Sequence, residues 1–347
     1  MAAPDTRTGA IRDFILSHVQ QYPTSIARMA ADTFGISRQG VNRHLTALLK
    51  DGLLAASGAT KGRQYNLAVL SEDELAVTLD RKTGEDVIWR QHVAPALAEL
   101  PRNVHDIWHY GCTEMINNAI DHSAGSTLVL RIRRTAVDTE VMIADDGIGI
   151  FRKIQQELHL SDPREGILEL AKGKLTTDPR RHTGEGIFFS SRMFEEFTIV
   201  SGGLFFSYAD GAPDHWLLRA SVKGPGTAVY MRTANNTSRT MSSVFDAFAP
   251  PDDEFSFRNT VVPVRLAQIG DENLVSRSQA RRLVARFDQF KKVVLDFAGV
   301  SMIGQAFADE VFRVFASEHP QVELAVSNAN AQVASMIRRA RAAQRGG

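Results

Sequence analysis

The sequence contains a single cysteine, Cys112, so no disulfide can form within the chain. One thiol fits a reducing compartment, and we expect a cytoplasmic protein. No apolar run approaches the roughly 18 residues that a membrane-spanning helix needs. The first residues also lack the continuous apolar stretch of a secretory signal. These absences predict a protein without a membrane partner.

The formal net charge of the chain is zero, because its 347 residues include 40 Lys and Arg and 40 Asp and Glu. The whole chain is therefore not drawn to anionic partners by its charge. The first 70 residues differ, since eight basic side chains stand against four aspartates there. A modestly basic end segment is typical of nucleic-acid contact.

The sequence shows no internal repeat and no low-complexity tract. The length predicts two or three domains, and the composition is typical of a globular protein. With the elements and resemblances given below, we expect a multidomain α/β protein. Two polar stretches divide the chain, 71–89 as a linker or helical connector and 234–256 as a linker. They separate an N-terminal unit of residues 1–70, a central unit of residues 90–233 and a C-terminal unit of residues 257–347.

The N-terminal unit is predicted to hold three helices and two short strands. The second helix is expected over Ser25–Thr33 with Thr24 as its cap, and the third over Arg38–Lys50 with Ser37 as its cap. This pattern resembles a winged helix-turn-helix domain across about residues 8–68, which implies DNA binding through the third helix and the wing. The alternative use of such a domain is protein docking or dimerisation. The resemblance assigns DNA contact to Arg38, Gln39, Asn42, Arg43, Lys61 and Arg63.

Four motifs follow one another in the central unit. Glu114 and Asn118 lie four residues apart on a helix expected over Asn103–His122, so they project from one side of it. A strand over Glu140–Ala144 runs into Asp-Asp-Gly-Ile-Gly at 145–149. Residues 182–187, His-Thr-Gly-Glu-Gly-Ile, open a helix, and Gly-Thr at 226–227 starts a further strand.

In this order and on these elements, the motifs resemble those of the GHKL ATPases, the family of gyrase, heat-shock chaperone, histidine kinase and mismatch-repair ATPases. The resemblance covers about residues 90–233 and implies a Bergerat-type α/β sandwich, a mixed sheet with helices on one face. It implies ATP and Mg²⁺ as ligands. The nucleotide-binding residues it assigns are Asn118, Asp145, Gly147, Gly149, Gly184, Gly186 and Thr227.

The resemblance also assigns a role to each residue type. Asp145 accepts a proton of the adenine amine and Thr227 supports the same edge, while Gly147 and Gly149 let the backbone pass close to base and ribose. Gly184 and Gly186 precede a helix whose N–H groups favour phosphate. Asn118 offers Mg²⁺ a neutral oxygen. Glu114 is the catalytic candidate, which orients or deprotonates either water or a protein hydroxyl.

Residues 151–182 occupy the place of the ATP lid in that family. Four of their basic side chains either meet phosphates or are solvated: Lys172, Lys174, Arg180 and Arg181. Histidine kinases of the two-component type also carry a phosphoacceptor histidine on a helical hairpin, and no such hairpin is visible here.

The C-terminal unit alternates strands and helices. Strands are expected over Thr260–Ala267, Val293–Phe297 and Val322–Val326, with helices over Arg277–Phe287, Ala306–Phe315 and Ala331–Arg345. This βαβαβα order predicts a small, mostly parallel sheet and resembles a STAS-like domain. Partners of anti-sigma-factor kinases carry a phosphorylated hydroxyl where this chain has Ala306, so we expect an unmodified domain that binds a protein or transmits the nucleotide state.

The order of the three units favours an ATP-binding, slowly hydrolysing transcriptional regulator that couples nucleotide state to DNA binding. Two alternatives remain open: a serine/threonine protein kinase of the anti-sigma-factor type acting on a separate partner, and a passive ATP sensor. A homodimer is compatible with paired DNA half-sites.

Overall fold

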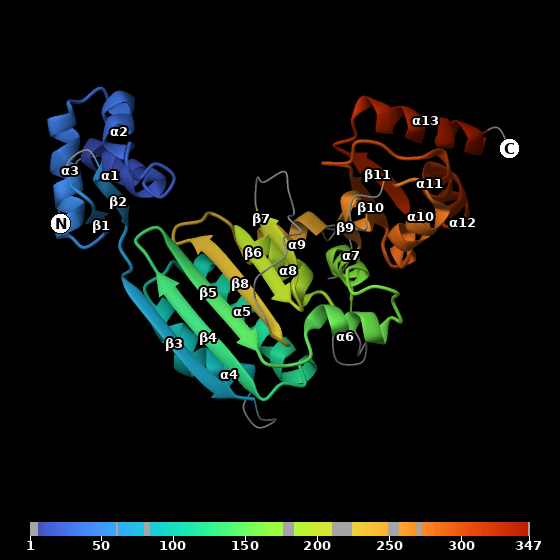
Figure 1. The fold of residues 1–347 in the computed structure, drawn as a ribbon, viewed down its shortest axis with the longest axis horizontal. Coiled ribbons are helices and arrows are strands. Elements are labelled where there is room, and N and C mark those ends of the chain that lie inside the picture. Colours follow the sequence, from blue (N-terminus) through green and yellow to red (C-terminus); the bar gives the residue numbers. More distant parts are fainter. Residues whose placement is uncertain are drawn as a thin grey trace.

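A computed structural model describes residues 6–59, 62–79, 84–175, 184–209, 224–248, 257–268 and 273–345 (Figure 1). These ranges form a mixed α/β protein with sheets of two, three and six strands. That confirms the multidomain α/β class predicted from the sequence. No helix within the described ranges is long and apolar enough to cross a membrane.

The N-terminal unit consists of α1 (Thr6–His18), α2 (Ile26–Phe34), α3 (Arg38–Lys50) and the hairpin of β1 (Leu54–Ser57) and β2 (Gln64–Leu67). Its buried side chains include Ile15, Val19, Val41 and Leu45. Ser37 caps α3 as predicted, because its side chain accepts a hydrogen bond from the Gly40 N–H at 3.1 Å. The predicted Thr24 cap is wrong, because Ser25 occupies the cap position of α2 and makes no side-chain cap bond.

The central unit is built on a six-stranded sheet in the order β3-β4-β5-β8-β6-β7. The strands are β3 (Ser71–Thr78), β4 (Thr127–Arg134), β5 (Asp138–Asp145), β6 (Glu196–Ser201), β7 (Leu204–Ala209) and β8 (Thr227–Ala234). All five pairings are antiparallel, whereas the resemblance implies a mixed sheet. The stretch 71–89 is more than a connector, because β3 forms the edge of this sheet. The sequence also predicts a strand around 215–221, and these residues lie outside the described ranges.

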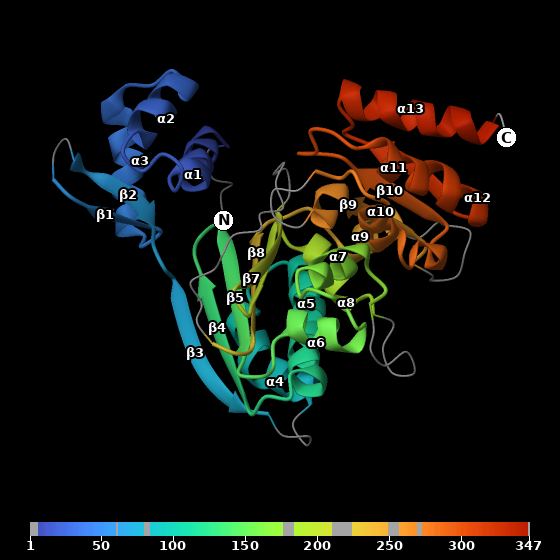
Figure 2. The same cartoon turned by 45° about the vertical axis from the view of Figure 1, so that its right-hand side comes forward.

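Helices cover one face of this sheet (Figure 2). The longest is α5 (Arg102–His122), whose side chains Ile107, Trp108 and Ile116 are buried against it. The others are α4 (Glu85–Ile88), α6 (Ile150–Glu157), α7 (Glu165–Lys172), α8 (Gly186–Met193) and α9 (Met241–Phe248). The last of these lies within 234–256, so that stretch is more than a linker. A π-helical turn over Trp89–Val93 and a 3₁₀ turn over Ala94–Leu97 join α4 to α5.

The C-terminal unit has a three-stranded sheet in the order β11-β10-β9, with both pairings parallel as predicted. Its strands are β9 (Asn259–Pro263), β10 (Lys292–Asp296) and β11 (Glu323–Ser327). The helices are α10 (Arg277–Val284), α11 (Gln305–Asp309), α12 (Ala316–Glu318) and α13 (Ala331–Arg345), with a π-helical segment at Glu310–Phe315 between α11 and α12.

Two predicted elements of the C-terminal unit end early. Residues Val264–Ala267 turn into a 3₁₀ helix where the sequence predicts a strand, since the chain leaves the sheet after Pro263. The helix predicted to reach Phe287 stops at Val284, because Ala285 leaves the helical region with ψ of 131° and Arg286 follows in a left-handed conformation with φ of 66°. A left-handed residue cannot continue a right-handed helix.

The buried side chains form two cores. The N-terminal unit encloses its own core. A second, continuous core runs through the central and C-terminal units, from Leu128 and Trp108 to Phe287 and Phe312. The central and C-terminal units are thus packed together, while the N-terminal unit stands apart at the other end of the molecule (Figures 1 and 2).

Candidate functional site

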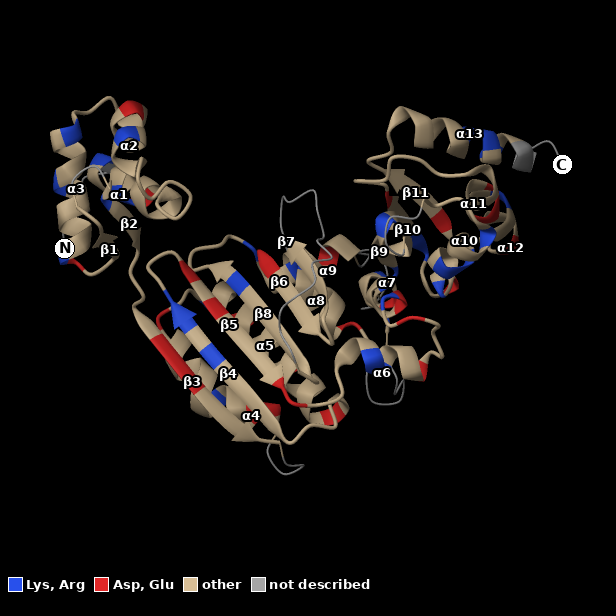
Figure 3. Ribbon diagram, in the orientation of Figure 1, with Lys and Arg blue, Asp and Glu red and all other residues tan. Residues whose placement is uncertain are grey.

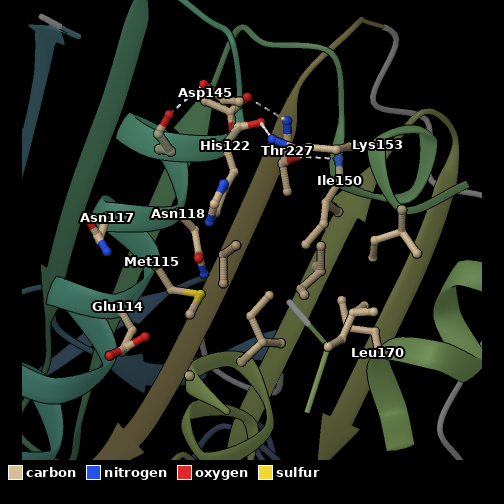
Figure 4. A pocket seen from close by; sticks show the side chains of 18 of the residues that line it. Glu114, Met115, Asn117, Asn118, His122, Asp145, Ile150, Lys153, Leu170 and Thr227 are labelled. Atoms are coloured by element: carbon tan, nitrogen blue, oxygen red, sulfur yellow. Dashed lines mark hydrogen bonds between the residues drawn. The ribbon is translucent and has the colours of Figure 1, made fainter. Parts of the chain in front are cut away.

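A cavity of about 300 Å³ lies between α5, the sheet and the helices α6 to α8 (Figure 4). The sequence motifs converge on it although they are far apart along the chain. Seven of the eight predicted catalytic and nucleotide-binding residues line it: Glu114, Asn118, Asp145, Gly149, Gly184, Gly186 and Thr227. The eighth, Gly147, does not. His182 and Thr183 lie outside the described residues.

One end of the cavity is defined by two paired strand ends. Asp145 closes β5 and Thr227 opens β8, and the antiparallel register places the two residues opposite each other. Asp145 Oδ1 accepts hydrogen bonds from the Gly147 N–H at 2.9 Å and the Thr227 N–H at 3.3 Å. No described neighbour donates to Oδ2. The Thr227 hydroxyl accepts from the Ile150 N–H at 2.9 Å, which leaves its own hydrogen for another acceptor.

Asp146, the next residue, points the other way. It is exposed and accepts from the backbone N–H groups of Ser126 at 2.7 Å and Thr127 at 2.9 Å, so it fixes the start of β4. These hydrogen bonds lower the pKa of Asp146 to about 2, whereas burial raises the pKa of Asp145. The two adjacent carboxylates therefore differ in role: Asp146 anchors the start of β4, and only Asp145 lines the cavity.

The glycines of the 145–149 motif are required by the protein itself. A Cβ on Gly147 would collide with the backbone of Ser123, and one on Gly149 would lie 2.5 Å from Ser201 Oγ. Gly149 also has a φ of 88°. The sequence interpretation, that both glycines make room for base and ribose, does not describe Gly147, because chain packing fills the space beside it.

The opposite wall is α5, which carries Glu114 and Asn118 on its cavity side (Figure 4). A Cβ on Gly186 would collide with the Glu114 carboxylate, so a glycine is needed where α8 begins. That contact brings the Glu-x-x-x-Asn helix and the Gly-Glu-Gly turn together. Tyr110, one turn before Glu114, is largely buried, and burial together with the charges of Glu114 and Glu185 raises its pKa.

Sequence reasoning missed Lys153, which enters the cavity from α6. Its Nζ donates to the His122 carbonyl at 3.0 Å, which joins α6 to the end of α5. Its position in the sequence was the signal that identifies it, because Lys153 follows Gly149 by four residues and lies in the first turn of a helix. The rest of the lining includes Asn117, Ala119, His122 and Ser123, in the C-terminal half of α5 and directly after it. Its other members are apolar and come both from the elements that carry the motifs and from α6, β6, and α7 with the residues after it: Met115, Ile143, Ile150, Ile154, Leu170, Leu175, Ile187, Phe188, Ile199 and Val229.

Unlike Lys153, the two described lysines that the sequence analysis singled out in the 151–182 stretch, Lys172 and Lys174, do not line the cavity. Lys172 is fully buried and Lys174 donates to the Gln289 carbonyl at 3.0 Å, so both are turned toward the C-terminal unit. For Lys172 this burial contradicts the interpretation as a solvated group, whereas Lys174 is only partly buried. Arg180 and Arg181 lie outside the described residues.

The predicted DNA-contacting residues of α3 share one exposed surface. Arg38, Gln39, Asn42 and Arg43 are exposed, and the opposite side of α3 carries the buried Val41, Leu45 and Leu48. Arg63 is also exposed and lies over the ring of Tyr65, with 5.3 Å to the centroid. Lys61 lies outside the described residues. Within the described ranges, no group of three or more His, Cys, Asp or Glu side chains could hold a metal ion.

A protein-family model for a STAS-like domain of unknown function (DUF4325) matches residues 279–334. This stretch runs from α10 to the first turn of α13, and it confirms the C-terminal STAS-like domain expected from the sequence. No curated protein matches the chain.

Proposed function

We propose that the cavity binds ATP with Mg²⁺ and that the chain is a regulator coupling its nucleotide state to DNA binding. The observation that carries the proposal is the convergence of four separate stretches on one cavity, with a carboxylate at one end and a glycine-flanked helix start at the other. Its volume of about 300 Å³ is at the lower limit for small-molecule sites.

The strand end suits adenine in particular. Asp145 Oδ2 is available to accept from the exocyclic amine, and the Thr227 hydroxyl is available to donate to the neighbouring ring nitrogen. Guanine presents a carbonyl and an N–H at the same two places, so it would set an oxygen against a carboxylate. The arrangement therefore favours ATP over GTP.

The α8 end suits phosphate. Gly184 and Gly186 line the cavity at the start of an eight-residue helix, where unpaired N–H groups and the helix dipole favour anions. Lys153 adds a positive charge in the same cavity. Asn118 is the side chain that would hold Mg²⁺, which takes its remaining oxygens from phosphate and water. When bound, the ion supplies charge neutralisation to the phosphates.

Glu114 decides whether the site is catalytic. Its carboxylate lies against Gly186, at the end of the cavity assigned to the phosphates. There it is placed to orient an attacking hydroxyl and accept its proton. Water as the attacking group gives a slow ATPase, and a hydroxyl of a separate protein gives a kinase.

Calorimetric titration of the full chain with ATP and with GTP tests the proposal. We expect ATP binding in the wild type and a loss of about 10- to 100-fold in Asp145→Asn, because a hydrogen bond to a charged acceptor is lost. Asp146→Asn is the matched control and should bind ATP normally. Equal binding in both variants would contradict the assignment.

Turnover and DNA binding need their own measurements. With γ-labelled ATP, Glu114→Ala should lose phosphate release or transfer while it keeps ATP affinity, and an unchanged rate would leave a passive sensor. Filter binding to a mixed-sequence duplex, with and without ATP, tests the regulator. Negligible DNA affinity in both conditions would overturn it.

A further inference from the structure

Helix α7 lies between the cavity and the C-terminal domain and contributes contacts to both. Its seven residues from Gly166 to Lys172 are all buried. Leu170 lines the cavity, and Leu175 does so just after the helix ends. It also packs against α6 and α8 and, in the C-terminal domain, against β9 and the 3₁₀ helix Val264–Ala267. Any force on α7 from that domain therefore reaches the cavity wall.

Lys172 is the centre of this junction. Its Nζ donates to Glu169 Oε1 at 2.6 Å and to the carbonyls of Arg282 at 2.8 Å and Ala285 at 3.1 Å. All three donors of the ammonium group are thus used, two of them across the domain boundary. Burial lowers the pKa of Lys172 to about 8. Such a group is costly to bury and tolerates little displacement, because each lost partner leaves a buried charge unsatisfied.

Two arginines of the C-terminal domain also bind α7 and the residues that follow it. Arg286 Nη1 donates to Glu169 Oε2 at 2.8 Å, and its Nη2 donates to the carbonyls of Gly173 and Lys174. Arg282 pairs with Glu165 at 3.0 Å. We call Glu165, Glu169, Lys172, Arg282 and Arg286 the α7 clamp. Arg286 holds its place in a left-handed backbone conformation, which costs energy for a non-glycine residue.

Aromatic rings extend the junction to the α8 wall. The ring of Phe257 lies 4.3 Å from that of Phe188, which lines the cavity, and 5.4 Å from that of Phe290 in the C-terminal domain. A Cβ on Gly173 would lie 2.7 Å from Phe257 and 2.8 Å from Phe188, so the chain after α7 also fits closely against this stack. Two cavity walls are thus joined to the same domain.

We propose that the STAS-like domain sets the nucleotide affinity of the cavity by holding α7 through the clamp, with Glu169 and Lys172 as positioning residues. This inference rests on the proposed function, because it concerns the regulation of that site. Coupling between sites is reciprocal, so nucleotide binding changes the stability of the clamp by the same factor. A partner bound to the STAS-like domain would thereby tune ATP binding without touching the cavity.

The test uses the full chain and three variants: Lys172→Met, the milder Glu169→Gln, and Arg313→Gln as a control. Arg313 pairs with Asp309 at 2.5 Å on the surface of the same domain and is not part of the clamp. Thermal unfolding first establishes that each variant is folded at the temperature used. Calorimetry with ATP should then give an affinity about 5- to 50-fold weaker in Lys172→Met. The loss should be smaller in Glu169→Gln and absent in Arg313→Gln.

Hydrogen exchange of α10 provides a readout that a merely structural role would not move. ATP should slow exchange over Arg277–Val284 in the wild type and in Arg313→Gln, and leave it unchanged in Lys172→Met. Unaltered ATP affinity in both clamp variants would overturn the inference and leave the proposed function standing. Failure of the wild type to bind ATP would overturn the proposed function and this inference with it.

Discussion

The two flanking units are attached to the central sheet in different ways. The N-terminal unit has its own core, and its chain passes directly into β3, where the Leu70 N–H donates to the Arg134 carbonyl at 2.8 Å. Val137, on the turn between β4 and β5, packs against that core. The C-terminal domain instead shares one core with the central unit and adds the α7 clamp.

This difference indicates two routes by which a change at the cavity reaches the flanking units. Packed side chains connect it to the C-terminal domain, so a change at α7 has to move both. The N-terminal unit is reached through the β3, β4 and β5 ladder, with Asp145 at the end of β5. We expect strong coupling on the first route and weaker coupling on the second. Figure 3 shows opposite charges on β3 and β4, the first strands of the weaker route.

The largest effect is expected from Phe257→Ala, which removes a ring shared by the central and C-terminal units. We expect a loss of about 3–5 kcal/mol in unfolding free energy, typical of a buried Phe replaced by Ala. Calorimetry should show one shifted transition for both units. Leu45→Ala is the counterpart in the N-terminal core and should shift only the transition of that unit. A common shift in both variants would break the comparison.

The pH dependence of stability sharpens the same contrast. The pKa of Lys172 is about 8 in the folded protein and 10.5 as its ordinary value, so between these limits the unfolded state binds more protons. Stability conferred by this site therefore rises with pH over that window. The melting temperature of the wild type should increase relative to Lys172→Met by a few degrees between the two limits. A constant or shrinking difference would contradict the buried lysine.

A smaller effect is expected at the exposed surface of α3. Arg43→Ala should weaken binding to a mixed-sequence duplex about tenfold and flatten its salt dependence, because one phosphate or base contact is lost. ATP affinity should not change, since this unit has a separate core. Arg102→Ala, an equally charged change at an exposed site of the central unit, should leave DNA binding intact. Equal losses in the two variants would point to non-specific charge attraction.

The smallest effect is expected from Glu74→Gln on β3. Its carboxylate accepts from Arg131 Nε at 2.6 Å across the strand pair, on the solvated face of the sheet. Exposed ion pairs contribute at most about 1 kcal/mol, and salt screens them. Chemical denaturation at low and high salt should show a small difference that disappears with added salt. A loss of unfolding free energy well above about 1 kcal/mol would contradict the weaker coupling that we expect through β3.

Local signals in the sequence were enough for many elements. The helix carrying Glu114 and Asn118, the cap at Ser37 and the strand before Asp145 all follow from periodicity and capping residues that lie next to them. Non-local decisions were missed. The edge strand β3 is polar, and its charged residues led to the prediction of a linker. In the folded protein these charges face arginines of β4, which the local sequence does not reveal. The early end of α10 at Ala285 is followed by the left-handed Arg286, whose guanidinium donates to Glu169 of α7 and to the Gly173 carbonyl.

The candidate site divides in the same manner. Its motif residues were predictable, because each motif fixes a side chain at a known position of one strand or helix. Its apolar walls and Lys153 were not, since Ile143, Leu170 and Val229 become neighbours only when α7 and the sheet are assembled. ATP, Mg²⁺ and DNA remain predictions for the experiments above.

By itself, the sequence determined which chemical groups are present and on which short elements they lie, from the carboxylate of Asp145 to the exposed arginines of α3. Only the tertiary structure decided that Lys172 and Lys174 turn away from the cavity and toward the C-terminal domain. The physical reason is that helical periodicity fixes which side chains share a face, whereas the identity of the neighbour that covers this face depends on packing between distant segments.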